Sequence, residues 1–372
     1  MLFRSTDSDL TARVPVSAGP HAFGATFLKN GSSLIETERQ PLQSHYNEQR
    51  HPRLTPTIQL VTITGPHAAR GAADTPSRRR LFVCHPAKPE EEEACARDIV
   101  ATVLRRAYRR PVSAAEVAVP MAFYTEARTA GDFDAGIERA LTAVLVSPAF
   151  LFRVERDPDS AAAGTAYRVS DLELASRLSF FLWSSIPDDE LLEAAIRGDL
   201  SRPAELERQT RRMLADPRVT ALADNFAGQW LNLRGLQSSG PLPLVFPDFD
   251  DPLRQSMRRE VELLFDSFVR EDRNVAELLT ADYTFVDERL ARHYGVPNIY
   301  GGHFRRISLG PDMDARRGLL GKGAILLASA LADRTSPVYR GKWVLLNVLD
   351  TIPPDPPPNV PPLKQSKQEQ EQ

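Results

Sequence analysis

Apolar residues recur at helical spacing along most of the chain between residues 79 and 350. Ile99, Val103 and Ala107 share one face of a predicted helix. Ser-x-x-Glu capping boxes at Ser113–Glu116 and Ser170–Glu173 predict two further helix starts. Similar patterns predict helices over 133–146, 203–215, 217–234, 251–270, 284–294 and 317–331, and one after Ser336-Pro337. The predicted fold class is therefore mainly α, with several helical subdomains.

Residues 1–78 follow a different pattern and are predicted to be a short β-rich remnant of an upstream domain. The β-branched run 57–64 ends at Gly65-Pro66, and the segment 22–28 is followed closely by Asn30-Gly31. Because both dipeptides are turn signals, the two segments are predicted to be strands. Two strands are too few to close a sandwich alone. We therefore expect the chain to start inside a domain, with any signal peptide upstream of Met1.

The rest of the chain divides by composition into three helical domains and a tail. The predicted helical domains are 79–157, 165–300 and a small one at 303–350, which opens with a strand at 304–309. Seven of the 30 prolines lie in 352–362, so 351–372 is predicted to be a polyproline linker followed by a disordered Gln-rich tail.

Charge and hydropathy exclude several classes of protein. The 372 residues carry 46 basic and 49 acidic side chains, so no basic field points to a nucleic-acid partner. No apolar run reaches the ~18–20 residues of a membrane-spanning helix, so no transmembrane segment is expected. The basic residues are nearly all arginine, with six lysines in the chain.

The two cysteines, Cys84 and Cys95, leave two alternatives open. Cys84 ends the apolar segment 81–83, read as the end of a strand, and Cys95 lies in the first turns of a helix, so the two can approach to disulfide distance. Two unpaired core thiols are the other alternative. Neither cysteine stands in a Cys-x-x-Cys-His motif, and Cys84-His85 has no second clustered pair of metal ligands, so no cofactor or metal site is predicted in this chain.

Candidate chemistry is concentrated in two segments. His293 and Tyr294 end the segment 282–295, where the imidazole is suited to proton transfer or to positive charge at a helix C-terminus. Arg334 and Arg340 flank a predicted helix start and suit either anion binding or a capped helix with exposed arginines. These four residues are weak candidates for catalysis.

Three other motifs have a structural explanation beside a functional one. Asn225 and Gln229 share a helix face and suit either sugar binding or a buried polar pair between helices. Glu262 and Asp266 suit acid–base chemistry or, preferably, intrahelical ion pairs. The glycines of the segment 318–323 fit no phosphate-binding motif, and close packing explains them better.

Four segments carry a family resemblance: 75–84, 171–183, 282–295, and 334–343 with the proline run after it. Together the chain resembles planctomycete-type multidomain proteins of unknown function associated with cytochrome c domains, over about residues 75–362. The resemblance implies export to the periplasm or secretion, and haem c attached in a segment that follows the proline run in the family. This chain lacks that motif, so we expect it to be a fragment without the haem domain.

The resemblance carries over no catalytic residue and leaves three hypotheses. The first is a scaffold portion of an exported cytochrome c-associated protein. The second is an oxidoreductase whose haem is supplied by a missing domain, with His293, Tyr294, Arg334 and Arg340 beside it. The third is an extracellular polysaccharide-binding protein that binds carbohydrate through its N-terminal region. The partners implied are a redox partner or an extracellular polymer.

Overall fold

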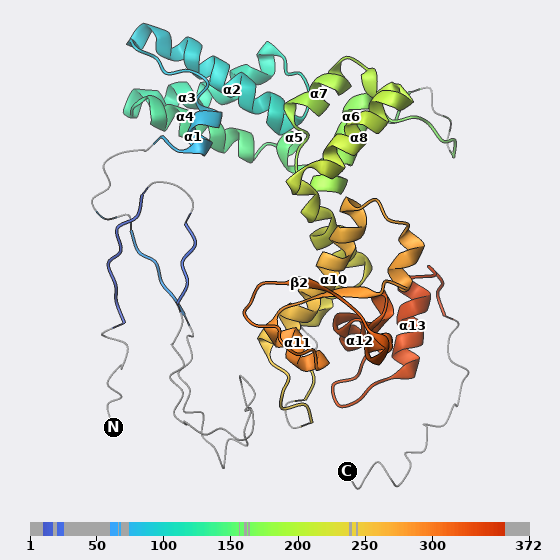
Figure 1. Ribbon diagram of the computed structural model, residues 1–372. Helices are drawn as coiled ribbons and strands as arrows, with labels where there is room; N and C mark the ends of the chain where they lie inside the picture. The colour runs from blue at the N-terminus through green and yellow to red at the C-terminus, as the bar shows by residue number, and fades with distance from the viewer. Residues whose placement is uncertain are drawn as a thin grey trace, which may run out of the picture. The chain divides into compact units, whose positions relative to one another are not determined.

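A computed structural model describes residues 10–17, 21–25, 60–65, 67, 74–155, 157–159, 162, 164–237, 240–242 and 245–353 (Figure 1). Within these ranges the chain is mainly helical, and its sheet is a single pair of short strands. The described residues fall into two compact units. The first unit runs to Phe180 and includes Ser185–Thr210, and the second comprises Phe181–Ser184 and the chain from Arg211. No helix of the described chain is long and apolar enough to span a membrane.

The first unit is built around three helices that lie side by side, α2 (Glu92–Tyr108), α3 (Ala114–Ala130) and α4 (Phe133–Leu145) (Figure 1). The predicted capping box is confirmed: Glu116 N–H donates to Ser113 Oγ, and Ser113 N–H donates to the Glu116 carboxylate at 2.8 Å. The helices meet over fully buried apolar side chains, namely Ile99, Leu104, Ile137 and Ala140. The helical prediction for this part of the chain is confirmed.

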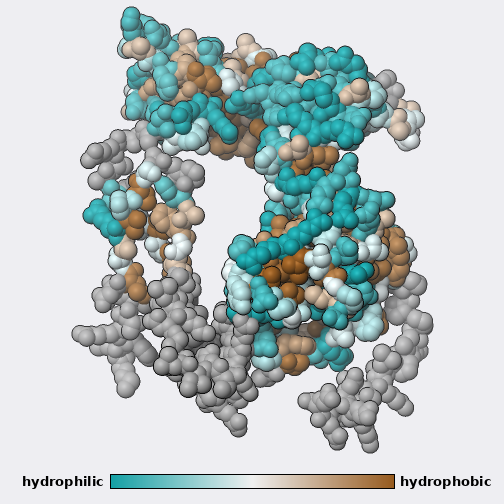
Figure 2. All heavy atoms as spheres, viewed as in Figure 1, coloured by the Kyte–Doolittle hydropathy of each residue, from teal (hydrophilic) through white to brown (hydrophobic). Residues whose placement is uncertain are grey.

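Shorter elements complete the first unit. They are α1 (Pro76–Leu81), η1 (Pro89–Glu91), α5 (Pro148–Leu151), α6 (Asp171–Trp183), α7 (Asp189–Ile196), η2 (Asp199–Ser201) and α8 (Pro203–Ala215). The boundary between the units falls inside α6 and α8. Figure 2 shows that hydrophilic residues cover most of the visible face of α6–α8.

Only part of the predicted β-rich N-terminal segment lies in the described chain. Residues 10–17, 21–25 and 60–65 form neither helix nor strand, and the remaining residues of the two predicted strands lie outside the described chain. A two-stranded hairpin is marginal without a further strand or helix to cover it. The segment that ends at Leu81 is a helix and not a strand, because Thr75 accepts the N–H of Arg78 and Pro76 suits the first helical turn.

The second unit surrounds one long helix, α10 (Asp251–Arg270). Its other helices are η3 (Pro217–Val219), η4 (Leu222–Ala227), α9 (Gly228–Trp230), η5 (Leu233–Gln237), η6 (Val275–Leu279), α11 (Glu288–Tyr294), η7 (Pro311–Arg316), η8 (Leu319–Gly321), α12 (Gly323–Ala328) and α13 (Pro337–Asn347). The core contains Val261, Leu264, Val286, Leu290 and Ala324. The predicted helix 251–270 and the predicted cap at Ser336 are confirmed.

The predicted helix 284–294 is wrong at its start. β1 (Tyr283–Val286) pairs antiparallel with β2 (Arg305–Ser308), with Thr284 opposite Ile307. Aromatic and β-branched residues favour a strand, and the partner strand supplies the hydrogen bonds. This pairing also joins segments on both sides of the predicted domain boundary at 300–303.

Two other predicted helices are broken. The helix predicted over 217–234 contains a π-helical stretch, η4, between short helical pieces. The helix predicted over 317–331 begins only at Gly323, after the 3₁₀ turn η8.

Candidate functional site

Helix α10 carries several of the buried polar groups of the second unit. Asp250 caps it by accepting the N–H of Leu253 at 2.8 Å, and Arg289 from α11 binds the same carboxylate at 3.0 Å. Along the helix Ser256, Glu260 and Glu262 are buried. A buried polar group destabilises the fold unless it is hydrogen-bonded. The hydrogen-bond partners of these side chains therefore show which other elements α10 holds in place.

Glu260 lies at the centre of a buried polar cluster. Thr284 donates its hydroxyl to Oε1 at 2.5 Å, and Tyr294 donates its hydroxyl to Oε2 at 2.7 Å. The N–H of Gly323, at the start of α12, donates to the Tyr294 hydroxyl at 2.8 Å. We call Glu260, Thr284, Tyr294, Gly323 and the nearby Lys322 the Glu260 cluster. It ties α10, β1, α11 and α12 together.

Lys322 supplies the positive charge of the Glu260 cluster. Its side chain is completely buried, and Nζ donates to the carbonyl oxygens of Arg316 at 2.8 Å and Tyr283 at 3.3 Å. Burial lowers the pKa of Lys322 to about 8, although the Glu260 carboxylate opposes the shift. Burial raises the pKa of Glu260, and burial followed by the Glu260 charge raises the pKa of Tyr294.

The glycines of the segment 318–323 make this packing feasible, as the close-packing explanation requires. A Cβ on Gly323 would lie 2.9 Å from both the Tyr294 hydroxyl and Met257 Cγ, and one on Gly321 would lie 2.6 Å from the Ala315 carbonyl oxygen. The sequence reasoning missed the Glu260 cluster. The sequence does contain one signal for it, a lysine between two glycines in a chain whose basic residues are nearly all arginine.

The pH dependence of stability tests the charge on Lys322. Between pH 8 and 10.5 the unfolded chain holds the Lys322 proton while the folded chain releases it, so the contribution of Lys322 to the stability of the second unit rises with pH in this window. We expect the wild type to gain about 2 kcal/mol relative to Lys322→Met between pH 7.5 and 9.5. Urea unfolding followed by tryptophan fluorescence measures this difference. Equal pH slopes for both proteins would contradict it.

A cleft of about 990 Å³ lies against the first half of α10. Its wall includes Arg258 and Arg259, which donate to the two oxygens of Glu262 at 2.7 and 3.1 Å. Arg259 also lies 3.8 Å from Asp224, whose pKa is raised by burial first and by Glu262 second. We call this feature the α10 cleft. The intrahelical ion pairs preferred for Glu262 and Asp266 are confirmed, since Asp266 pairs with Arg270 at 2.8 Å.

The four predicted site residues are not joined into one group. Tyr294 belongs to the Glu260 cluster, whereas His293 is exposed beside it, with a pKa lowered by partial desolvation and then by Arg316. Arg334 pairs with Asp333 at 3.5 Å, and Arg340 donates to the hydroxyl of Thr335, the residue before the helix cap Ser336, at 2.8 Å. Within the described ranges no hydrogen bond or ion pair connects either arginine to His293 or Tyr294.

The amide pair on η4 and α9 is more exposed than expected. Asn225 is half-buried and Gln229 is exposed, so the two do not form a buried pair. Asn225 Nδ2 donates to Ser184 at 2.7 Å, and its Oδ1 accepts from Arg234 at 2.9 Å. Beside them Phe226 stacks on Trp230 with ring centroids 5.8 Å apart.

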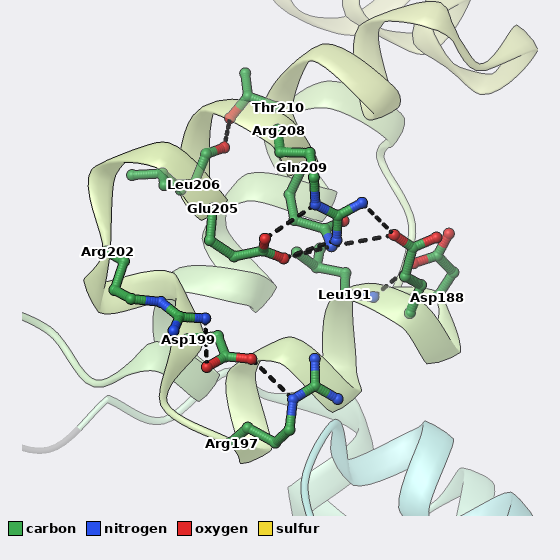
Figure 3. Close-up of polar contacts among 11 residues, drawn as sticks. Asp188, Leu191, Arg197, Asp199, Arg202, Glu205, Leu206, Arg208, Gln209 and Thr210 are labelled. Carbon is green, nitrogen blue, oxygen red and sulfur yellow. Dashed lines mark hydrogen bonds and ion pairs between the residues drawn. The ribbon is translucent and has the colours of Figure 1, made fainter.

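A polar network in the first unit joins α7 to α8 (Figure 3). The buried Gln209 donates to Glu190 at 3.2 Å and to Glu205 at 3.1 Å, and Arg208 bridges the same two carboxylates. The hydrogen bond from Arg208, followed by that from Gln209, lowers the pKa of Glu205 to about 2. Since these groups satisfy one another, the network is explained as structural.

Cys84 and Cys95 form a disulfide with their Cα atoms 5.8 Å apart. The disulfide alternative is therefore confirmed over unpaired thiols. Both sulfurs are used by this bond and the cysteines are eleven residues apart, so they do not fit covalent attachment of a c-type haem. No group of metal-ligating side chains occurs in the part of the chain that the structure describes.

Three family models match the chain. They are PSD5, a protein of unknown function (DUF1595), at residues 95–155, PSD4, a protein of unknown function (DUF1592), at residues 169–296, and PSCyt3, a protein of unknown function (DUF1588), at residues 316–372. No curated protein matches the chain, and no solved structure matches it. The Glu260 cluster draws its residues from two of these domains, with Glu260, Thr284 and Tyr294 in the second and Lys322 and Gly323 in the third.

Proposed function

Because the chain belongs to the planctomycete-type family of multidomain proteins with cytochrome c-associated domains of unknown function, we propose that it is a scaffold portion of an exported protein. In this role the helical units hold other domains of the full-length protein in the periplasm or outside the cell. Haem c then belongs to another segment of that protein, and the redox partner meets it there.

The disulfide is the observation that supports this proposal most directly. Disulfides persist in oxidising compartments and are rare in the cytosol. Cys84–Cys95 fastens the end of α1 to the start of α2, and Arg78 on α1 binds Asp134 on α4 at 2.7 Å. Both contacts hold a short helix on the three-helix bundle. A rigid support benefits from such links, whereas nothing in them suits chemistry.

Expression of the full chain in a bacterial periplasm tests the proposal. Without reductant, the intact mass should be lower than the reduced mass by two hydrogens, and Cys84→Ser with Cys95→Ser should lower the free energy of unfolding of the first unit by about 2–4 kcal/mol. Circular dichroism during urea unfolding measures the loss. Two free thiols in the periplasmic protein would contradict export and with it the proposed role.

The α10 cleft favours a second function, the binding of an extracellular polymer. The N-terminal region first considered for that role lies mostly outside the described chain, whereas the cleft belongs to the second unit alone.

A further inference from the structure

The α10 cleft presents donors and acceptors close together on one wall. Gln255 is exposed and donates to Asp251 at 2.7 Å, one helical turn from Arg259. Arg259 bridges Glu262 and Asp224, which it approaches at 3.1 and 3.8 Å. A ligand in the cleft would therefore meet amide, guanidinium and carboxylate groups within one helical turn or two.

The charges of the cleft nearly cancel. Three arginines, at positions 254, 258 and 259, face four carboxylates, at positions 224, 251, 262 and 287. The carboxylates hold the arginines in ion pairs such as Arg258–Glu262 and Arg254–Asp251. Such a wall gives no net positive field to attract a phosphate or a polyanion. It suits a neutral ligand that both donates and accepts hydrogen bonds.

The cleft also contains apolar surface. The half-buried ring of Phe304 and the exposed ring of Pro252 line it together with Leu236. Its volume of about 990 Å³ lies at the upper end of the range for small-molecule sites, which is ~300–1,000 Å³. Sugar rings combine hydroxyl groups around their edge with apolar C–H faces, and this combination matches the two kinds of surface here.

We infer that the α10 cleft binds a segment of a neutral oligosaccharide, with Gln255 and Arg259 bonded to its hydroxyls and Phe304 against a ring face. The inference rests on the proposed binding of an extracellular polymer, for which it names the chemical class. The proposed binding involves no chemical reaction of the sugar. In it the carboxylates of the cleft accept hydrogen bonds and pair with the arginines.

Isothermal titration calorimetry of the full chain against cellohexaose, xylohexaose, laminarihexaose and chitohexaose tests this inference. At least one hexasaccharide should bind, and Arg259→Ala, Gln255→Ala and Phe304→Ala should each weaken that binding about 5- to 10-fold, as the loss of one hydrogen bond or ring contact does. The matched control is Arg270→Ala, which removes an arginine from an ion pair on the same helix outside the cleft. It should change the affinity less than twofold.

Two results would overturn the inference: no binding of any of the four hexasaccharides, or binding that Arg259→Ala and Gln255→Ala leave unchanged. Circular dichroism of each variant checks that it is folded. A protein that forms its disulfide in the periplasm and binds no hexasaccharide loses this inference and keeps the proposed scaffold role. A protein that binds but has free thiols loses the export proposal instead.

Discussion

Glu260→Ala should lower the free energy of unfolding of the second unit by about 3–5 kcal/mol, because it leaves two buried hydroxyls without their acceptor and a buried cation without its counter-charge. The hydroxyls of Thr284 and Tyr294 both donate to Glu260, and Lys322 is completely buried near it. All three tryptophans, Trp183, Trp230 and Trp343, belong to the second unit, so tryptophan fluorescence during urea unfolding reports on that unit.

Two further variants separate the charge from the packing. Glu260→Gln keeps most of the volume and an acceptor oxygen, so it should cost less than Glu260→Ala. In the double variant Glu260→Ala with Lys322→Met the uncompensated cation is gone, so the loss should be smaller than the sum of the two single losses. Asp266→Ala, which removes a carboxylate from an ordinary ion pair on the same helix, should cost at most about 1 kcal/mol. A loss below about 1 kcal/mol for Glu260→Ala would show that the Glu260 cluster does not hold these elements together.

The helices that the sequence predicts well are those whose signals are local. The capping boxes at Ser113 and Ser170 form as expected. Helix α10 occupies the predicted residues because Asp250 caps its start, Pro252 lies in its first turn and the apolar spacing continues along it. β1 was missed since a four-residue strand depends on its partner, which comes about twenty residues later.

The candidate site was predictable only in part. Tyr294 was singled out by its place at a helix end, but its function in the fold depends on Glu260, 34 residues earlier, and Gly323, 29 residues later. The α10 cleft could not be anticipated at all, because Asp224, Arg259 and Phe304 come from three separate elements. In the sequence Glu260 resembles any carboxylate on a charged helix. Only its partners distinguish it from Glu262, since Glu260 accepts from hydroxyls of β1 and α11 while Glu262 pairs with arginines of its own helix.

Among substitutions that add a single methyl group, Gly318→Ala should be the most damaging. It should lower the free energy of unfolding of the second unit by at least about 3 kcal/mol. Gly318 has φ +59° and ψ −178°, a region that is essentially restricted to glycine. A Cβ there would lie 1.9 Å from the carbonyl oxygen of Leu279, which is backbone and cannot move aside without disturbing η6. Gly318 N–H also donates to the carbonyl oxygen of Ala281 at 2.9 Å. A shift of the Gly318 backbone would therefore break this hydrogen bond, which connects the start of η8 to the segment before β1.

Two matched glycines separate backbone strain from the steric clash. Gly295 has φ +74° with nothing near its Cβ position, so Gly295→Ala should cost about 1 kcal/mol for the left-handed backbone alone. Gly310 has φ −73° and equally open space, so Gly310→Ala should be close to neutral. If Gly318→Ala prevents folding, Gly321→Ala gives a second test, since its Cβ would lie 2.6 Å from Ala315 O without a positive φ. Equal losses across the series would contradict the prediction, because they would mean that the backbone around Lys322 can move to accept a methyl group. In that case the close packing could not be what keeps Lys322 buried.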